Sequence, residues 1–239
     1  MSHRGTVPPT LDSHPDAVVF DLDGVLLDTT ENMRLAFAAT WTAAGRDGEA
    51  PFAEFLTHMG APLPRILGLL GLPETLTDVY SAESRRHLGL VEAYPGVREL
   101  LSALKAAGTP VAIATGKSHE RAMLALRSAG LDGDIDVVIG SDLVGRPKPA
   151  PDIVHTALAR LRASTGKAID PRRTLFVGDS VLDMRAGTAA GVVVVAAGWG
   201  QTAPEILRAE GPDGYAARVA DLFGVLGLPT PSSLEVNLA

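Results

Sequence analysis

The sequence contains no cysteine among its 239 residues. This absence excludes disulfides, thiol chemistry and zinc sites built on thiolates, so any bound metal must be held by oxygen or imidazole ligands. Basic residues are also few, because 21 Lys and Arg stand against 28 Asp and Glu, for a formal net charge of −7. No basic cluster is longer than SRRH at 84–87. The sequence therefore offers no face suited to nucleic acid.

Long apolar runs are missing as well. The sequence has no uninterrupted apolar stretch of the roughly 18 residues that a membrane helix needs. The N-terminus has no apolar segment after a basic one, as a secretory signal would have. We therefore expect a cytoplasmic protein without a membrane span. Residues 1–16 and 229–239 lack periodic apolar positions, and we expect flexible tails there.

The residues that are present alternate between two patterns. Short β-branched runs recur, separated by helix-like segments, and these runs are AVVFDLDG (17–24), PVAIATGK (110–117), IDVVIGSD (135–142), RTLFVGDS (173–180) and GVVVVAAG (191–198). A strand followed by a helix, repeated along the chain, is typical of a parallel sheet with crossover helices. The sequence therefore predicts an α/β fold with a Rossmann-like parallel sheet and helices on both faces.

Residues 30–93 interrupt this alternation, because no β-branched run occurs there. Met33, Phe37 and Trp41 stand at helical spacing before Gly45, and a similar pattern follows between Pro51 and Gly60. Such an apolar stripe usually packs against other helices. We expect an inserted helical cap domain at 30–93, with the Rossmann-like core formed by 17–29 and 94–228.

Polar residues cluster where the predicted strands end. The clusters are Asp21 and Asp23, then Thr115, Gly116 and Lys117, then Lys148, and finally Asp179 with Asp183. Each cluster alone has an ordinary explanation as a turn, a helix cap or a surface side chain. Ligands of open parallel sheets, however, bind outside the carboxyl ends of the strands. We therefore expect these side chains to meet in one site.

The chemistry of this combination points to phosphoryl transfer. The carboxylates of Asp21, Asp23, Asp179 and Asp183 would repel one another unless a cation neutralised them. All-oxygen ligation favours Mg²⁺, which commonly binds one or two carboxylates together with a substrate phosphate. The hydroxyl of Thr115, the amides around Gly116 and the ammonium of Lys148 suit phosphate oxygens. A small-molecule phosphate ester is the expected ligand.

The first two acids can divide the chemical work. Asp21 is the candidate nucleophile, which would form an aspartyl-phosphate. Asp23 is the candidate general acid and base, which would protonate the leaving alcohol and later take a proton from water. Gly24 permits the sharp departure of the chain after them.

Four segments resemble, in order, the motifs of the haloacid dehalogenase superfamily: DLDGVLLDT, ATGKS, RPKPAPD and GDSVLDMRAGTAAG. The resemblance extends over about residues 17–225. It implies a Rossmann-like core, a helical cap inserted after the first motif and Mg²⁺ dependence. It also implies site roles that agree with those argued above for Asp21, Asp23, Thr115, Lys148, Asp179 and Asp183.

Departures from subfamily patterns narrow the reaction. Dehalogenases proper and phosphonoacetaldehyde hydrolases lack the acid that stands here as Asp23. The β-phosphoglucomutases carry a histidine where this chain has Met33, and a cap-loop arginine where HMGAPLPRIL (58–67) is mostly apolar. A phosphatase is therefore preferred, although Arg65 keeps the phosphosugar mutase as an alternative. A non-catalytic binding module of the same fold is a second alternative.

Among phosphatases, the sequence is similar to the phosphoglycolate phosphatase group. It is more similar to relatives encoded with 3-amino-5-hydroxybenzoate synthesis in antibiotic pathways, through segments such as NMRLAF, RDGEAPF and VIGSD. This resemblance implies a phosphorylated sugar, aminosugar or cyclitol as substrate. Lys117, His58 and Arg65 are candidate substrate contacts. A basic side chain at a strand-to-helix turn or in a loop is more often solvated, and we expect this of Lys117 and of Arg146. A lone histidine in the cap, such as His58, is seldom catalytic.

Overall fold

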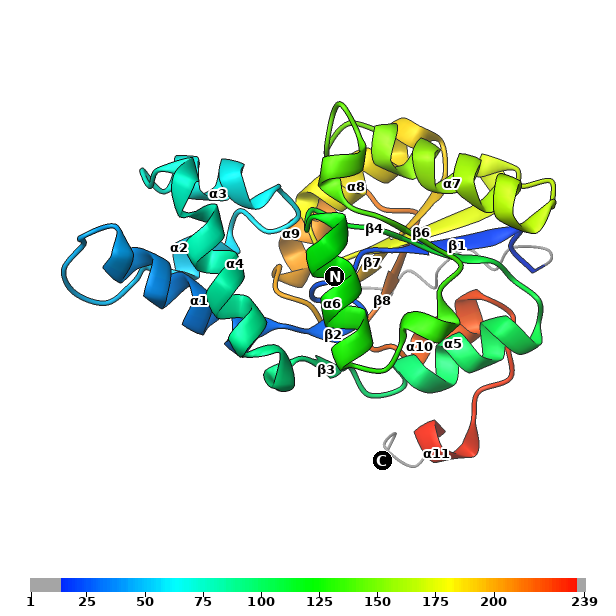
Figure 1. Cartoon of the computed structure of the whole chain (residues 1–239). Helices are drawn as coiled ribbons and strands as arrows, with labels where there is room; N and C mark the ends of the chain where they lie inside the picture. The colour runs from blue at the N-terminus through cyan, green and yellow to red at the C-terminus, as the bar shows by residue number, and fades with distance from the viewer. Residues whose placement is uncertain (1–13, 236–239) are drawn as a thin grey trace, which may run out of the picture.

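A six-stranded parallel sheet forms the centre of the core in the computed structural model, which describes residues 14–235 (Figure 1). Its spatial order is β5-β4-β1-β6-β7-β8. The strands are β1 (Ala17–Phe20), β4 (Val111–Ala114), β5 (Val137–Ile139), β6 (Thr174–Gly178), β7 (Val193–Ala197) and β8 (Gly214–Ala216). Five of them were predicted. The edge strand β8 was missed, because its three residues, Gly-Tyr-Ala, carry no β-branched side chain.

Helices cover both faces of the sheet, which confirms the predicted α/β architecture. One face packs against α5 (Val97–Ala106), α6 (His119–Ser128) and α10 (Asp221–Val225), and the other against α7 (Asp152–Thr165) and α8 (Val181–Ala190), with α9 (Pro204–Ala209) beside α8. Within β1, Val18 and Phe20 enter the first core, whereas Ala17 and Val19 enter the second. A strand buried on both faces is apolar throughout, as the sequence of β1 is.

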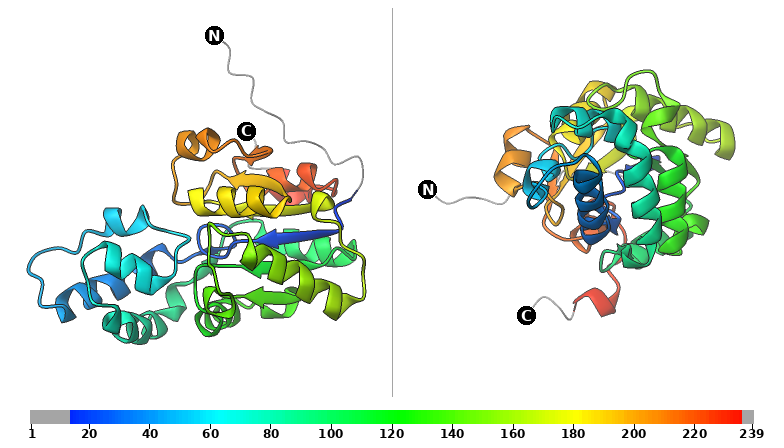
Figure 2. Two further views of the ribbon diagram at one scale, coloured as in Figure 1. Left: turned by 90° about the horizontal axis from the view of Figure 1, so that it is seen from above. Right: turned by 60° about the vertical axis from the view of Figure 1, so that its left-hand side comes forward.

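The inserted segment forms a separate helical layer beyond the carboxyl ends of the strands (Figure 2). Its helices are α1 (Thr30–Ala43), α2 (Phe52–Leu56), α3 (Leu63–Leu69) and α4 (Thr77–Arg86), with 3₁₀ turns at Glu74–Leu76 and Leu88–Leu90. In its interior, the ring of Phe55 packs at a tilt against Phe37 and stacks on Tyr80, with centroids 4.8 Å and 5.9 Å apart. The cap therefore has a hydrophobic core of its own.

The two chain crossings between core and cap pair with each other. Strand β2 (Leu27–Asp28) is antiparallel to β3 (Glu92–Ala93). Two residues per strand are too few to show a period, so this ribbon could not be predicted from the sequence. It joins the base of the cap to the core at both crossings.

Parts of the two predicted tails belong to the core. The backbone N–H of Asp16 donates to Arg173 O at 2.8 Å, and the Asp16 carboxylate accepts from Arg173 Nε at 2.8 Å. At the other end, α11 (Ser232–Glu235) places Leu234 against the first core. The remaining residues of both predicted tails, 1–13 and 236–239, lie outside the described residues.

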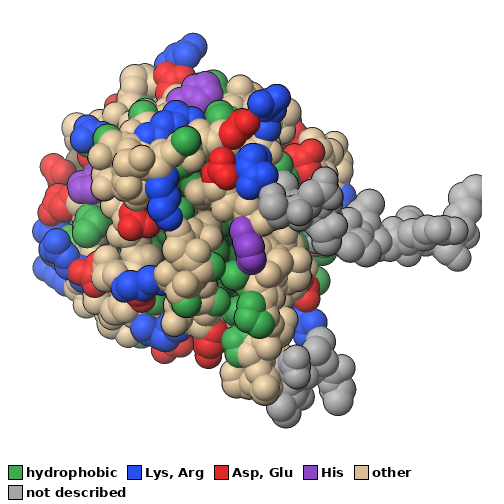
Figure 3. All heavy atoms as spheres, turned by 90° about the vertical axis from the view of Figure 1, so that its right-hand side faces the viewer, with side chains coloured by type: hydrophobic (Ala, Val, Ile, Leu, Met, Phe, Trp, Pro, Cys, Tyr) green, Lys and Arg blue, Asp and Glu red, His purple; other side chains and the backbone are tan. Residues whose placement is uncertain are grey.

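The end of the molecule opposite the cap carries a mixture of acidic and basic side chains (Figure 3).

Further 3₁₀ turns at Asp132–Asp134, Ser141–Leu143 and Pro171–Arg173 connect elements of the core. Within residues 14–235, no helix has both the length and the apolar character to cross a membrane.

Candidate active site

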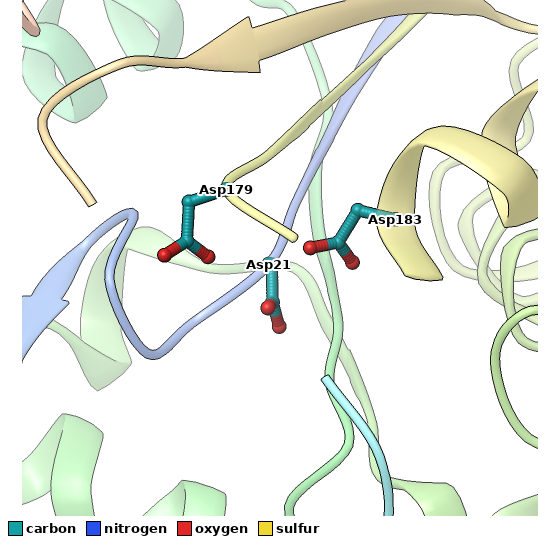
Figure 4. Close-up of side chains that lie close together, drawn as sticks. All are labelled: Asp21, Asp179 and Asp183. Carbon is teal, nitrogen blue, oxygen red and sulfur yellow. The ribbon is translucent and has the colours of Figure 1, made fainter. Parts of the chain in front are cut away.

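Three buried carboxylates converge at the carboxyl edge of the sheet. Asp21 follows β1, Asp179 follows β6 and Asp183 lies in the first turn of α8 (Figure 4). One oxygen from each lies within 4.8 Å of the others. The register between β1 and β6 explains the meeting, because Phe20 pairs with Val177 and both chains leave the sheet at the same level.

The start of α8 fixes Asp183. Ser180 is the N-cap, and its side chain accepts from the Asp183 N–H at 3.2 Å. In return, Asp183 Oδ2 accepts from Ser180 N at 3.0 Å and from Ser180 Oγ at 2.6 Å. This capping box holds one carboxylate oxygen, so Oδ1 is the oxygen left for the cluster.

Two glycines make room for Asp179. A Cβ added at Gly24 or at Gly200 would lie 2.2 Å from Asp179 Oδ2. The backbone N–H of Gln201 donates to the same oxygen at 2.8 Å. Glycine is therefore required at position 24 for two reasons. A side chain would collide with Asp179, and the φ of +80° is one that other residues rarely adopt.

Lys148 forms ion pairs with two of the three acids, Asp21 and Asp183. Its side chain is fully buried, with Nζ 3.1 Å from Asp21 Oδ1 and 2.5 Å from Asp183 Oδ1. Neither contact is aligned as a hydrogen bond, so both are ion pairs of close charges. The ammonium also lies 5.2 Å from the centre of the Phe176 ring. The cluster thus has one ammonium for three carboxylates.

The excess of negative charge in this cluster shifts the pKa values of its carboxyl groups. Burial, and then repulsion by Asp183, raise the pKa of Asp21 to about 7. Burial and repulsion by Asp21 raise the pKa of Asp179 well above its ordinary value. Burial opposes the charge of Lys148, but Asp183 and Asp21 more than compensate and raise its pKa.

A hard divalent cation fits this cluster. Asp21 Oδ1 and Asp183 Oδ1 are buried, accept no hydrogen bond and share the single charge of Lys148, so the three buried carboxylates keep an excess of negative charge that a further cation would neutralise. The donors are all carboxylate oxygens, which suit Mg²⁺ or Ca²⁺. Asp21, Asp179 and Asp183 are the residues whose side chains could hold such an ion.

Asp23 lies apart from this group, which differs from the prediction that its carboxylate joins the metal ligands. Both of its oxygens accept from Lys117 Nζ at 2.8 Å, and Oδ1 also accepts from Thr29 Oγ1 at 2.7 Å. The chain turns after β1, so the two acids face different neighbours. Burial alone would raise the pKa of Asp23, but Lys117 and Thr29 hold it below its ordinary value.

Lys117 is buried rather than solvated, which corrects the general expectation for a lysine at such a turn. Its ammonium is committed to Asp23, and burial lowers its pKa despite this partner. Arg146 does follow that expectation, because it is exposed and pairs with Asp152 at 2.8 Å.

Thr115 and Gly116 follow β4, the other neighbour of β1. Thr115 is buried, and its hydroxyl accepts from the N–H of Lys117 at 3.2 Å. A Cβ added at Gly116 would lie 2.4 Å from the carbonyl oxygen of Gly60, in the cap. The cap loop therefore rests directly on the segment predicted to bind phosphate.

The two residues of the cap that were predicted to contact substrate lie beside a cleft. His58 and Arg65 line a cleft of about 600 Å³ between the cap and the core, whose core side includes Ser180 and Gln201. Met33 is buried in the cap and borders a smaller cavity of about 30 Å³, together with Asp23 and Lys117. Within the described part of the chain, no hydrogen bond or ion pair joins His58 or Arg65 to the carboxylate cluster.

The sequence-based search missed two residues near the site, Arg121 and Gln201. Arg121 lies in the first turn of α6, borders the smaller cavity and helps to lower the pKa of Asp23. Its position four residues after Lys117, at the carboxyl edge, was a usable signal. Gln201 acts mainly through its backbone N–H, and no side-chain pattern could reveal that contact.

Comparison with known proteins supports one assignment. Residues 15–191 match the model of the haloacid dehalogenase-like hydrolases. The chain is 34% identical to "Probable phosphatase IndB" of Dickeya dadantii over 87% of this chain and 91% of that protein. It is 30% identical to "Pyrophosphatase PpaX" of Bacillus velezensis, over 91% and 99% of the two chains.

A solved structure agrees with this match. The crystal structure of CbbY from Rhodobacter sphaeroides in complex with phosphate superposes with a TM-score of 0.75 and 25% identity, covering 90% of this chain and 100% of that one. The matched family model includes all the carboxylates and Lys148 described above. This chain belongs to the haloacid dehalogenase-like hydrolase family.

Proposed function

We propose that this protein is a Mg²⁺-dependent phosphatase that hydrolyses a small phosphorylated metabolite through an aspartyl-phosphate on Asp21. The observation that carries the proposal is the cluster of Asp21, Asp179 and Asp183, buried around the single ammonium of Lys148. The names of the relatives, a probable phosphatase and a pyrophosphatase, support the same reaction class. So does the phosphate in the related crystal structure.

Asp21, Asp179 and Asp183 would hold the metal. When bound, Mg²⁺ would supply positive charge that lets an anionic nucleophile approach an anionic phosphate. Lys148 contributes fixed positive charge at the same place, because both of its ion pairs and its full burial prevent it from leaving. Thr115 and the amides around Gly116 complete the phosphate site on the side of β4.

The reaction has two displacements at phosphorus. A carboxylate oxygen of Asp21 forms a bond to phosphorus, and the bond from phosphorus to the leaving oxygen breaks. Asp23 gives its proton to that oxygen, and the alcohol departs. Asp23 then takes a proton from water, whose oxygen attacks phosphorus and releases inorganic phosphate and free Asp21.

Lys117 positions Asp23 for this work. The ammonium bonds both oxygens of the carboxylate, so Asp23 is held away from the metal cluster and close to the cap. If phosphate occupies the segment of Thr115 and Gly116, the leaving group must lie between the nucleophile and the cap. The ion pair must loosen when Asp23 carries a proton, because a neutral carboxyl has lost its charge.

The cap excludes water from the site. Gly60 has a φ of +87°, and a Cβ there would lie 2.5 Å from Ser180 Oγ. Together with the contact between Gly116 and Gly60 O, this places the loop at 58–65 across the edge of the sheet. Exclusion of water strengthens the charges inside and limits loss of intermediates.

The proposed substrate is a phosphorylated sugar, aminosugar or cyclitol. The resemblance to phosphatases encoded with 3-amino-5-hydroxybenzoate synthesis supports a sugar, aminosugar or cyclitol phosphate. Phosphate release with Mg²⁺ across phosphoglycolate, hexose 6-phosphates, aminosugar phosphates and β-glucose 1-phosphate tests it. Release that EDTA abolishes and Mg²⁺ restores is the expected result, whereas rates unchanged in EDTA would exclude the metal.

A phosphosugar mutase is the second candidate, favoured by the place of Arg65 on the cleft of about 600 Å³. The same panel, run with a bisphosphate activator, separates the two reactions. Isomerised product without release of phosphate would identify a mutase. Substitutions in the loop at 58–65 should change selectivity among sugar phosphates more than hydrolysis of a small generic ester.

A further inference from the structure

The cavity of about 30 Å³ beside Asp23 has more positive than negative charge. Its charged borders are Asp23, Lys117 and Arg121, and its cap side is apolar. Lys117 bonds both oxygens of Asp23 and balances its single negative charge. The cavity therefore has one cation more than its acids can pair.

Arg121 is that unpaired cation. No ion pair of Arg121 occurs within residues 14–235, although most other arginines there have one. Its Nε is buried and has no hydrogen-bond partner. The guanidinium lies 5.0 Å from the centre of the Tyr80 ring, on cap helix α4. An aromatic face steadies the cation, and the buried Nε remains a donor without a partner.

The position of Arg121 relates it to the leaving group. Asp23 and Gly116 border the same cavity, so a phosphate at the Thr115 and Gly116 segment would have its ester oxygen near Asp23. The remainder of the substrate would then extend towards Arg121 and the cap. A guanidinium with free donors in an apolar surrounding recognises carboxylates and phosphates.

We propose that Arg121 is a specificity-determining residue that binds a second anionic group, carried by the leaving-group part of the substrate. The inference rests on the proposed phosphatase function. A carboxylate is the smallest anionic group that matches the planar fork of a guanidinium. A substrate amine at this place would meet two cations, Lys117 and Arg121, so an aminosugar phosphate is disfavoured.

The test compares two matched pairs of phosphate esters, with Mg²⁺, in the full chain. The pairs are phosphoglycolate with 2-hydroxyethyl phosphate, and 6-phosphogluconate with glucitol 6-phosphate. Within a pair, the carboxylate replaces an uncharged group. We expect the wild-type protein to favour the carboxylate member by about tenfold or more in kcat/KM in at least one pair, as a charged hydrogen bond implies.

Arg121→Gln should reduce this preference to about twofold or less, mainly through KM of the carboxylate member. Arg127→Gln is the matched control, because Arg127 lies on the same helix but is exposed and pairs with Asp132. Arg121→Lys should restore part of the preference, which also guards against a variant that fails to fold.

Two outcomes would overturn the inference. One is a wild-type protein that hydrolyses both members of each pair equally. The other is an Arg121→Gln protein that loses activity on charged and uncharged members alike. Failure of the proposed function would look different, because the wild-type protein would then release no phosphate from any ester, including p-nitrophenyl phosphate.

Discussion

Two neighbouring groups of buried charge at the edge of the sheet are unbalanced in opposite directions. The acidic group has three carboxylates, Asp21, Asp179 and Asp183, around one ammonium. The basic group has two cations, Lys117 and Arg121, around the single carboxylate of Asp23. Only one residue, Leu22, separates Asp21 from Asp23 in the sequence.

The difference shows how one turn of chain can serve two chemical tasks. Repulsion raises the pKa of Asp21 to about 7, whereas Lys117 and Thr29 lower the pKa of Asp23. The acidic group requires an added cation, and the basic group can accept an added anion. In the proposed reaction, a metal and a substrate satisfy these opposite requirements, and the phosphate lies between them.

The largest expected effect comes from removing the nucleophile in the acidic group. Asp21→Asn should lower phosphate release by about a thousandfold or more, a loss of about 4 kcal/mol in transition-state stabilisation. The fold should survive, because the substitution removes repulsion with Asp183. Asp152→Asn, at an exposed ion pair, is the control. Near-normal turnover by the Asp21 variant would refute covalent catalysis.

The next effect comes from removing the one ammonium of that group. Lys148→Met leaves the carboxylates buried without a cation, so we expect the free energy of unfolding to fall by about 3 to 5 kcal/mol in EDTA at pH 8. Urea unfolding measures this change. Lys105→Met, at an exposed pair with Asp134, should change it by less than about 0.5 kcal/mol. Equal effects of the two variants would show that Lys148 is not needed by the cluster.

A smaller effect is expected in the basic group. Lys117→Met removes the charge that lowers the pKa of Asp23, so that pKa should rise. Because the first displacement needs Asp23 in its protonated form, the basic limb of the kcat/KM profile should move to higher pH. Loss of the positioning contact should lower kcat/KM by about a hundredfold, at the low end of acid–base effects. Lys167→Met, at a surface lysine, serves as control. A profile that keeps its shape would contradict the positioning role of Lys117.

The smallest effect concerns stability and pH. The folded pKa values of Asp21 and Asp179 are raised above the unfolded value of about 3.9, so protons stabilise the metal-free fold at low pH. This contribution is lost as pH rises through about 7. Mg²⁺ should therefore raise Tm more at pH 8 than at pH 5.5. An equal shift at both pH values would argue against binding at these carboxylates.

Much of this site was predictable because parallel strands end at a common edge. The alternation of β-branched runs with helices placed Asp21, Thr115 and Asp179 at strand ends, and the motif order added Lys148 and Asp183. The opposite charge balance of the two groups was not predictable. It depends on the turn after β1, which sends Asp23 to Lys117, and on the depth at which Lys117 is buried.

The parts that were missed depend on tertiary contacts. The ribbon of β2 and β3 is too short to show a period, and Asp16 is tied to the core by Arg173, a residue distant in sequence. Arg121 lies on an amphipathic helix, and its contact with Tyr80 on the cap appears only in the folded structure. Sequence patterns report periodicity and motifs, whereas these contacts depend on how distant segments of the chain come together.

Pre-steady-state hydrolysis of p-nitrophenyl phosphate by Asp21→Asn and Asp23→Asn, with Mg²⁺, tests the central claim most directly. Nitrophenolate leaves without needing a proton, so Asp23 is required only for the second displacement. We expect Asp23→Asn to release one nitrophenolate per protein in a burst and then to stall as phosphoprotein, while Asp21→Asn gives no burst. A burst from Asp21→Asn, or steady wild-type turnover by Asp23→Asn, would contradict the division of work between the two acids.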